Sequence, residues 1–299
     1  MVHFERAIFI SWYCGKGDCS FCYMSTQKKL ITDPKKARRS PASIMAEAII
    51  CRELGWKIEF LSGGYESYSD DELVNLVKKI KEAYGKRLWL NLGALPADLL
   101  TRLRPYTKGV CGAVECINPE IRSKVCPSKP LKDIRQTFKS CDELGLKKSI
   151  TIIIGLGETI RDFPRLRKFI ENNSISKITF YALNPHKGTP FKKGPDTGYY
   201  AQWIEKTRNA FPKLEIVAGS WVNRLNEIST LLNAGADSIT KFPAIRLFGT
   251  KYACQIEAEV KKANRKFKGS LTVLPKFDTS KYETAVKNKL DSYLRRMHK

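Results

Sequence analysis

Residues 12–23 read Trp-Tyr-Cys-Gly-Lys-Gly-Asp-Cys-Ser-Phe-Cys-Tyr, which places three cysteines, Cys14, Cys19 and Cys22, within nine residues. Four residues separate the first two cysteines and two residues separate the last two, a spacing typical of metal-binding loops. The two glycines between the first pair allow the backbone to curl until all three sulfurs face inward. The stretch therefore predicts an inorganic centre held by three thiolates.

The number of cysteines in this loop bears on the kind of centre. A structural zinc site normally takes four protein ligands, and no CxxC or HxxxH pair follows at the usual distance. Three cysteines suit a [4Fe-4S] cluster in which one iron lacks a protein ligand and can bind a small molecule. A zinc knuckle, or a chance group of cysteines, is the alternative interpretation.

The composition indicates a globular intracellular protein. The chain has 299 residues with 42% hydrophobic residues, within the range of one α/β barrel. No run approaches the roughly 20 apolar residues that span a bilayer, and the first residues lack the pattern of a signal peptide. Nine cysteines, an odd number, suit a reducing compartment better than a secreted disulfide framework. We expect a cytoplasmic protein without a membrane association.

The charge balance is strongly basic. Lysine and arginine number 53 against 30 aspartates and glutamates, a formal net charge of +23. Such an excess attracts polyanions or acidic proteins to the surface. A heat-adapted, lysine-rich surface is the alternative, but glutamate usually rises with lysine in such proteins. The charge predicts an acidic macromolecular partner and does not distinguish RNA from protein.

Apolar, β-rich runs alternate with helical patterns along the chain. The first strand ends at Cys14, so the cysteine loop lies at the carboxyl end of a strand, where α/β barrels hold their active sites. We predict an α/β fold, a (β/α)8 TIM-type barrel that is complete or nearly so, over residues 1–275. A basic C-terminal helical tail, residues 276–299, is expected to pack on the barrel. The expected strands cover residues 7–13, 57–61, 87–92, 109–115, 149–154, 178–183, 214–218 and 236–240.

The cysteine loop resembles that of the radical S-adenosylmethionine (radical SAM) enzymes, whose usual signature is CxxxCxxC with an aromatic residue before the last cysteine. Phe21 holds that place, and the first gap is one residue longer than usual. The resemblance implies that Cys14, Cys19 and Cys22 hold a [4Fe-4S] cluster. It further implies that the open iron chelates SAM, which an electron from the cluster cleaves to a 5′-deoxyadenosyl radical. Phe21 and Tyr23 are expected cofactor contacts.

Two further motifs follow the order of this family. Ser-Gly-Gly-Tyr-Glu follows the second strand, and Gly63 and Gly64 match a GGE-like turn that holds the SAM amino group. Glu66 stands one residue late in that motif. The segment Ile-Ile-Ile-Gly-Leu-Gly-Glu-Thr resembles the fifth-strand motif of biotin-synthase-like members, where Gly155 is expected near the adenine. A plain strand and turn would explain either motif alone.

Other SAM contacts rest on the same resemblance. Relatives place a carboxylate or amide at the end of strand four, which is Glu115 here, and an arginine in the following helix, which is Arg135. Residues 184–190, Asn-Pro-His-Lys-Gly-Thr-Pro, resemble a loop after strand six in biotin synthase and the hydrogenase maturases. His186 in that loop is a weaker candidate for proton transfer or for substrate contact.

Three more cysteines, Cys111, Cys116 and Cys126, gather near the end of strand four. The resemblance to lipoyl and biotin synthases suggests a second iron–sulfur cluster that donates sulfur. In an uninterrupted strand the first two would face opposite sides about 16 Å apart, and buried core cysteines are the alternative. Three remaining cysteines fall in predicted helices and are expected in the core: Cys51, Cys141 and Cys254.

The sequence thus predicts a radical SAM enzyme of the biotin-synthase-like branch that abstracts hydrogen from an unactivated carbon. Archaeal-type lipoyl synthases are the specific resemblance, which implies sulfur insertion into an octanoylated, acidic carrier protein, with a reductant and a partner synthase. Another cofactor maturase or a methyltransferase-like enzyme is the first alternative. An RNA-modifying enzyme is the next, and a basic scaffold with a structural metal is the alternative outside enzymes.

Overall fold

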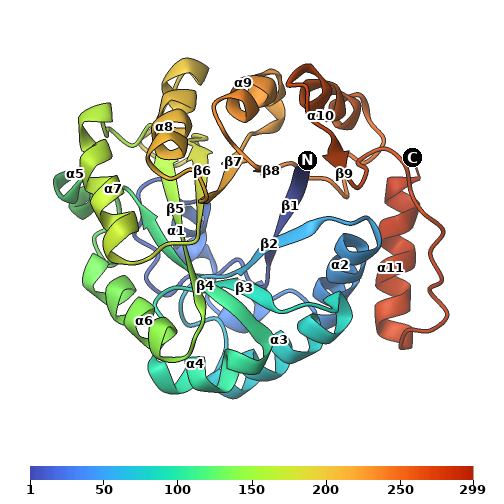
Figure 1. Ribbon diagram of the computed structural model, residues 1–299. Coiled ribbons are helices and arrows are strands. Elements are labelled where there is room, and N and C mark those ends of the chain that lie inside the picture. Colours follow the sequence, from blue (N-terminus) through green and yellow to red (C-terminus); the bar gives the residue numbers. More distant parts are fainter. Residues whose placement is uncertain (299) are drawn as a thin grey trace.

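Eight parallel strands close into a barrel at the centre of the molecule (Figure 1). The predicted (β/α)8 fold is confirmed. The computed structural model describes residues 1–298. Strands pair in the order β2-β3-β4-β5-β6-β7-β8-β1, and β1 pairs back to β2 to close the ring. The strands are β1 (Val2–Phe9), β2 (Lys57–Ser62), β3 (Leu88–Asn91), β4 (Thr107–Glu115), β5 (Lys147–Ile154), β6 (Lys177–Ala182), β7 (Glu215–Gly219) and β8 (Ser238–Thr240).

Helices surround the barrel and bury their apolar faces against the strands (Figure 1). Among residues 1–298, no helix is long and apolar enough to cross a membrane. The helices are α1 (Tyr23–Gln27), α2 (Pro41–Glu53), α3 (Asp70–Tyr84), α4 (Ala97–Leu103), α5 (Pro119–Val125), α6 (Leu131–Glu143), α7 (Phe163–Asn172), α8 (Thr197–Ala210), α9 (Ile228–Asn233), α10 (Lys251–Lys262) and α11 (Thr284–Met297).

Local sequence signals mark the ends of helices α2 and α3. Ser40 caps α2 by accepting a hydrogen bond from the amide of Ser43, and Pro41 occupies the first turn. Ser69 and Glu72 form a reciprocal capping box at the start of α3. Gly85 ends α3 with a left-handed φ of 80°. These caps set where each strand–helix unit turns and so fix the loops above the barrel.

The amino-terminal end of the barrel holds buried charges. Glu5 of β1 is fully buried and pairs with Lys177 of β6 across the interior. Lys57, which begins β2, donates a 2.8 Å hydrogen bond to Glu215 of β7. Because buried charges are stable only when paired, this layer joins four strands electrostatically. It also explains why β1 begins at Val2 and not at residue 7, since two charged residues interrupt its apolar pattern.

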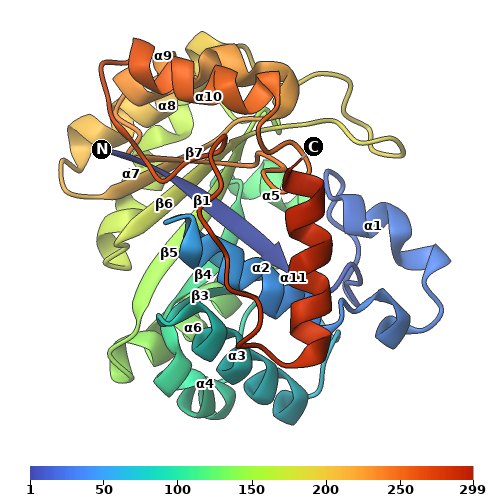
Figure 2. The ribbon, with the colours of Figure 1, turned by 90° about the vertical axis from the view of Figure 1, so that its right-hand side faces the viewer.

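The C-terminal helix lies outside the strand–helix repeat. Figure 2 shows α11 upright alongside α2, and the hydroxyl of Tyr293 on α11 lies 2.7 Å from the hydroxyl of Ser43. A short strand, β9 (Phe267–Lys268), pairs with the start of β1 on the way to this helix. The last segment of the chain is therefore held against the first strand and the first large helix of the barrel.

Candidate active site

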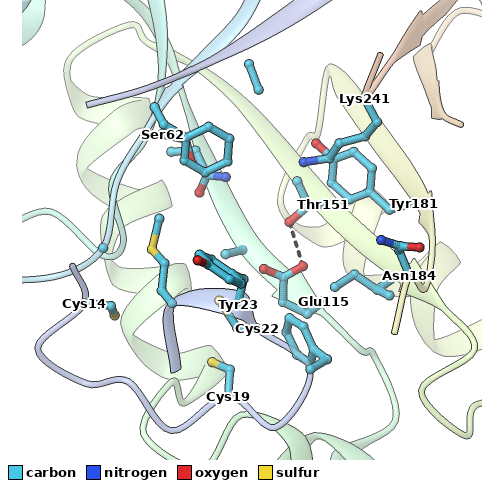
Figure 3. Close-up of a pocket in the computed structure, with 18 of the residues that line it drawn as sticks. Cys14, Cys19, Cys22, Tyr23, Ser62, Glu115, Thr151, Tyr181, Asn184 and Lys241 are labelled. Carbon is cyan, nitrogen blue, oxygen red and sulfur yellow. Dashed lines mark hydrogen bonds between the residues drawn. The ribbon is translucent and has the colours of Figure 1, made fainter. Parts of the chain in front are cut away.

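A cavity of about 530 Å³ opens at the carboxyl end of the barrel, within the usual size range of ligand sites. The predicted site residues that line it are Cys14, Cys19, Phe21, Cys22, Tyr23, Gly63, Gly64 and Glu115. Figure 3 shows the three cysteines on one side of this space and Lys241 with Tyr181 on the other. The loops after β1, β2, β3, β4, β6, β7 and β8 contribute to its walls, and β5 contributes Thr151 and Ile153 from the strand itself.

The cysteine loop is fixed to its neighbours through its backbone. The amide of Gly15 donates a 2.9 Å hydrogen bond to the carbonyl of Tyr65, and the amide of Ser20 donates to the carbonyl of Val125 at 3.0 Å. The hydroxyl of Ser67 donates to the carbonyl of Tyr13 at 3.1 Å. The loop therefore rests between the turn after β2 and helix α5, with its cysteines directed to the cavity.

The three cysteines of the loop are thiols, the donor type that iron–sulfur clusters take. All nine cysteines are unbridged thiols. Within residues 1–298, no three cysteine, histidine or carboxylate side chains gather closely enough to hold one metal ion. The ligands of a [4Fe-4S] cluster each bind a different iron, so they surround a larger volume than the ligands of a single ion. Cys14, Cys19 and Cys22 border one such volume at the edge of the cavity.

The electrostatics around Cys19 favour a thiolate. A hydrogen bond from the thiol of Cys126, together with the ammonium of Lys129, lowers the pKa of Cys19 to about 7 against the effect of burial. Burial raises the pKa of Cys22, and Lys129 opposes that effect in part. Lys129 also lines the cavity, and burial would lower its pKa, but the neighbouring Cys19 and Glu115 raise it. A positive charge thus stands beside the cysteines.

The Gly-Gly turn after β2 approaches the cysteine loop closely. A Cβ atom on Gly64 would lie 2.2 Å from the carbonyl oxygen of Tyr13 and 2.4 Å from the Cβ of Cys14. Only glycine allows this contact, so the turn and the loop form one unit. Tyr65 lines the cavity, whereas Glu66 is exposed and directs its carboxylate toward Gly15. Tyr65, the residue inserted in the motif, therefore reaches the cavity, and Glu66 does not line it.

Glu115 ends β4 in a left-handed conformation with a φ of 60°, which directs its side chain into the cavity. Its Oε2 atom accepts a 3.1 Å hydrogen bond from the hydroxyl of Thr151 on β5 (Figure 3). A carboxylate held in this way can bind a cationic amino group. The contact between Glu115 and SAM stays a prediction.

Two predicted SAM contacts lie away from the cavity wall. Arg135 is exposed on α6, where its guanidinium lies 5.7 Å from the ring centre of Phe169. Gly155 has a φ of 107°, and its amide donates a 2.7 Å hydrogen bond to Glu158. Ile153, two residues earlier, lines the cavity instead. The apolar strand edge reaches the site, and the glycine turn above it supports the loop.

The three cysteines of the suggested second cluster are divided between two packed groups. Cys111 is buried inside the barrel with Phe60, Trp89 and Tyr181. Cys116 and Cys126 pack with Cys19 beneath the cysteine loop. Cys111 therefore does not lie with the other two.

The helical cysteines follow the prediction with one correction. Cys51 and Cys141 are buried, as expected. Cys254 is exposed, and the expectation of a core position was wrong. Helix α10 buries Ala253, Ile256 and Val260, so the face that holds residue 254 is directed to solvent.

Several cavity residues were not predicted. Sequence reasoning missed Thr151, Tyr181, Asn184, Trp221 and Lys241 as site residues. All but Thr151 lie at or just beyond the carboxyl ends of β6, β7 and β8, so the strand-end rule for barrels was a usable signal. His186 also lines the cavity, and burial with the nearby ammonium of Lys241 lowers its pKa.

Comparisons with known proteins agree with this geometry. A model described as the radical SAM superfamily matches residues 11–170. An uncharacterised protein of Methanocaldococcus jannaschii is 43% identical over 274 residues, covering 91% of this chain and 76% of that protein. Biotin synthase of Thermotoga neapolitana is 22% identical over 238 residues, covering 77% and 80%. The solved structure of methylornithine synthase is similar in fold, with a TM-score of 0.69 at 20% identity over 80% of this chain and 71% of that one.

Proposed function

The chain belongs to the radical SAM superfamily, and on that basis we propose that it cleaves SAM reductively and abstracts hydrogen from an unactivated carbon of a small substrate. The observation that carries the proposal is the placement of Cys14, Cys19 and Cys22 on the wall of one barrel cavity, beside the turn of Gly63 and Gly64. The family implies a [4Fe-4S] cluster and SAM, and the thiols in this loop fit the cluster.

Each wall of the cavity has a distinct task in this proposal. Cys14, Cys19 and Cys22 would hold the cluster, and Gly63 with Glu115 would orient the amino group of SAM. When bound, the cluster and SAM together supply the electron and the carbon-centred radical that a C–H bond of this strength requires. The apolar side chains of Ile153 and Phe60 line the same cavity and exclude water from the reacting carbon.

The direct test is formation of 5′-deoxyadenosine by the anaerobically reconstituted protein with SAM and dithionite. We expect product from the wild type and at least a hundredfold less from Cys19→Ala. Cys254→Ala serves as the matched control, because that thiol is exposed on α10, and should leave product formation unchanged. Equal product from wild type and Cys19→Ala would contradict the proposal.

Sulfur insertion is a second candidate, favoured by the two additional thiols next to the cysteine loop. Cys116 and Cys126 are both nearly fully buried and pack against Cys19. In this candidate the protein acts as a lipoyl-synthase-like sulfurtransferase on an octanoylated carrier protein, and the net charge of +23 attracts that acidic carrier. It requires a second [4Fe-4S] cluster as sulfur donor. Cys116 and Cys126 could be two of its ligands, and the others would have to be groups other than Cys111.

An octanoyl-lysyl peptide tests this second candidate. With SAM and reductant, with or without a partner synthase, mass spectrometry should detect a sulfur-containing product if the candidate is right. An unchanged peptide in every case, while 5′-deoxyadenosine still forms, would remove sulfur insertion and leave the primary proposal intact. A second measurement distinguishes a carrier protein from RNA as the partner. The affinity for tRNA is measured over a range of salt concentrations, because binding through phosphate contacts weakens steeply with salt.

A further inference from the structure

Lys241 occupies a conformation that few lysines adopt. It follows β8 directly, and its φ of 73° lies in the left-handed region. Among residues 1–298, five residues other than glycine have a positive φ, and two of them, Glu115 and Lys241, line the cavity. Strain of this kind persists where the surrounding structure fixes it, often at functional sites. The backbone at this point thus directs an ammonium group into the barrel.

Aromatic rings surround that ammonium group. The Nζ atom lies 4.4 Å from the ring centre of Tyr181, 5.7 Å from that of Trp221 and 5.8 Å from that of Phe9. Gly219 makes room for this arrangement, because a Cβ atom there would lie 2.3 Å from the Tyr181 ring and 3.1 Å from the Lys241 side chain. The rings stabilise the cation and present a flat apolar wall beside it.

The rings leave the hydrogen-bonding capacity of Lys241 unused. An ammonium has three N–H donors, and within residues 1–298 its Nζ has no hydrogen-bond acceptor and no carboxylate within 4.0 Å. Lysines deeper in the same barrel are paired, as Lys177 is with Glu5. The buried carboxylate of Glu59 is already bound by Thr240 at 2.6 Å and by Tyr181. Burial raises the pKa of Glu59, and the ammonium of Lys241 opposes that effect through its charge without contacting the carboxylate, so the N–H donors of Lys241 remain available to a ligand.

The surroundings favour a carboxylate over a phosphate. Phosphate sites in proteins combine several cations or a row of backbone amides at a helix N-terminus. Here one ammonium faces the cavity from β8, next to the neutral amide of Asn184 and the rings of Phe9 and Trp221. The other cations that line the cavity have charge partners of their own, since Lys129 lies beside Cys19 and Glu115 and Arg6 pairs with Glu47. The single charge at the end of β8 therefore matches one carboxylate, and the rings match an apolar body attached to it.

We propose that Lys241 binds the carboxylate of a small carboxylic acid whose apolar body lies between Phe9 and Trp221, and that this acid is the substrate. The inference rests on the proposed function, since the substrate carbon must face the cysteine loop across the cavity. Figure 3 shows Lys241 on the side opposite Cys14 and Cys19. A carboxylate there holds the molecule at one end and leaves its carbon chain directed toward the cluster.

SAM also has a carboxylate, so the experiment must distinguish binding of the substrate carboxylate by Lys241 from binding of the SAM carboxylate. Binding of phenylacetate, of the neutral phenylacetamide and of SAM is measured by isothermal titration on the reconstituted full-length protein. The variants are Lys241→Met and Lys241→Arg. Lys206→Met is the matched control, because Lys206 is an exposed lysine 6.0 Å from the ring centre of Phe163, outside the cavity.

We expect the wild type to bind phenylacetate at least tenfold more tightly than phenylacetamide. Lys241→Met should abolish that preference, whereas Lys241→Arg and Lys206→Met should retain it, and SAM affinity should stay unchanged throughout. Equal binding of acid and amide by the wild type, or a preference that survives in Lys241→Met, would overturn the inference. A tenfold loss of SAM affinity in Lys241→Met would assign Lys241 to the SAM carboxylate and would also overturn it.

The outcome is separable from that of the proposed function. If the wild type discriminates acid from amide but forms no 5′-deoxyadenosine with SAM and reductant, the proposed function fails and the carboxylate site stands as a binding site. If 5′-deoxyadenosine forms but acid and amide bind alike, the enzyme class stands and the inference fails. Circular dichroism of each variant confirms that the fold is retained.

Discussion

The hydroxyl of Thr151 in β5 donates a 3.1 Å hydrogen bond to the carboxylate of Glu115 at the end of β4, inside the cavity. This contact fixes one of the two cavity residues other than glycine whose backbones are left-handed. We predict that Thr151→Val weakens SAM binding about tenfold, because a hydrogen bond to a charged group contributes about 1.5–3 kcal/mol.

Isothermal titration of SAM into the reconstituted variant checks this prediction. Thr101→Val is the matched control, since the hydroxyl of Thr101 donates to the carbonyl of Ala97 on the exposed helix α4. Its SAM affinity should equal that of the wild type. The same affinity in Thr151→Val would show that Glu115 is oriented by its backbone alone.

The iron content of the reconstituted protein distinguishes one cluster from two. We predict about four irons per chain, falling to none in the triple variant Cys14→Ala, Cys19→Ala, Cys22→Ala. The expectation of one cluster follows from the placement of Cys111, which is buried in a different packed group from Cys116 and Cys126. Eight irons that fall to four would instead establish a second cluster and make sulfur insertion the leading chemistry.

Gly64→Ala is predicted to displace the cysteine loop. The added Cβ atom would meet the carbonyl oxygen of Tyr13 at 2.2 Å, a contact that real structures do not tolerate. We expect iron incorporation to fall at least by half and 5′-deoxyadenosine formation to fall at least tenfold. Gly198→Ala is the matched control, because its Cβ atom would meet its nearest neighbour, Asp196, at an ordinary 3.4 Å. Normal iron content in Gly64→Ala would show that the loop moves without losing its ligands.

A buried ion triad on the outside of the barrel contributes pH-dependent stability. Glu47 on α2 accepts hydrogen bonds of 2.6 Å from both Arg6 and Arg39. Burial alone would raise the pKa of Glu47, but the two guanidinium groups outweigh it and lower that pKa below its ordinary value of 4.5. The contribution to stability is therefore present above about pH 4.5 and is lost as the pH falls through the lowered pKa.

Glu47→Gln should reduce the free energy of unfolding by about 3 kcal/mol at pH 7, because it leaves two guanidinium groups without their charge partner. Urea titrations at pH 7 and pH 3 should show a smaller difference between variant and wild type at the lower pH. Glu82→Gln, on the exposed face of α3, should have the same free energy of unfolding as the wild type at both pH values. A difference that does not depend on pH would assign the loss to packing.

The sequence located the cysteine loop and the repeating strands because both depend on local patterns. Apolar runs and helix caps are read from neighbouring residues, as Ser69 with Glu72 shows. The beginning of β1 was missed because Glu5 is buried beside partners that are distant in sequence, Lys57 and Lys177, the second of which lies 172 residues away. Charges that pair across a barrel interior leave no signal in the hydrophobic pattern of either strand.

Contacts inside the cavity also join residues that are distant in sequence, so they could not be predicted from local patterns. Lys241 follows a predicted strand, but its contact with Tyr181 depends on the closure of the barrel. Cys111 and Cys116 are close in sequence, but an irregular register between β4 and β5 and the left-handed turn at Glu115 separate their surroundings. The short spacing in sequence suggested that these cysteines share a cluster. Spacing alone does not determine the direction of each side chain, which depends on the tertiary structure.

The paired charges at the amino-terminal end of the barrel also affect the order of ligand exchange. Glu5 lines the cavity at its inner end and is fully buried, and Lys177 closes the space behind it. We therefore expect molecules to enter and leave at the carboxyl end of the barrel. Whichever ligand lies deeper must bind first and depart last, so steady-state kinetics with two ligands should follow a compulsory sequence. A dead-end inhibitor that occupies the outer position would then trap the inner ligand and slow its release.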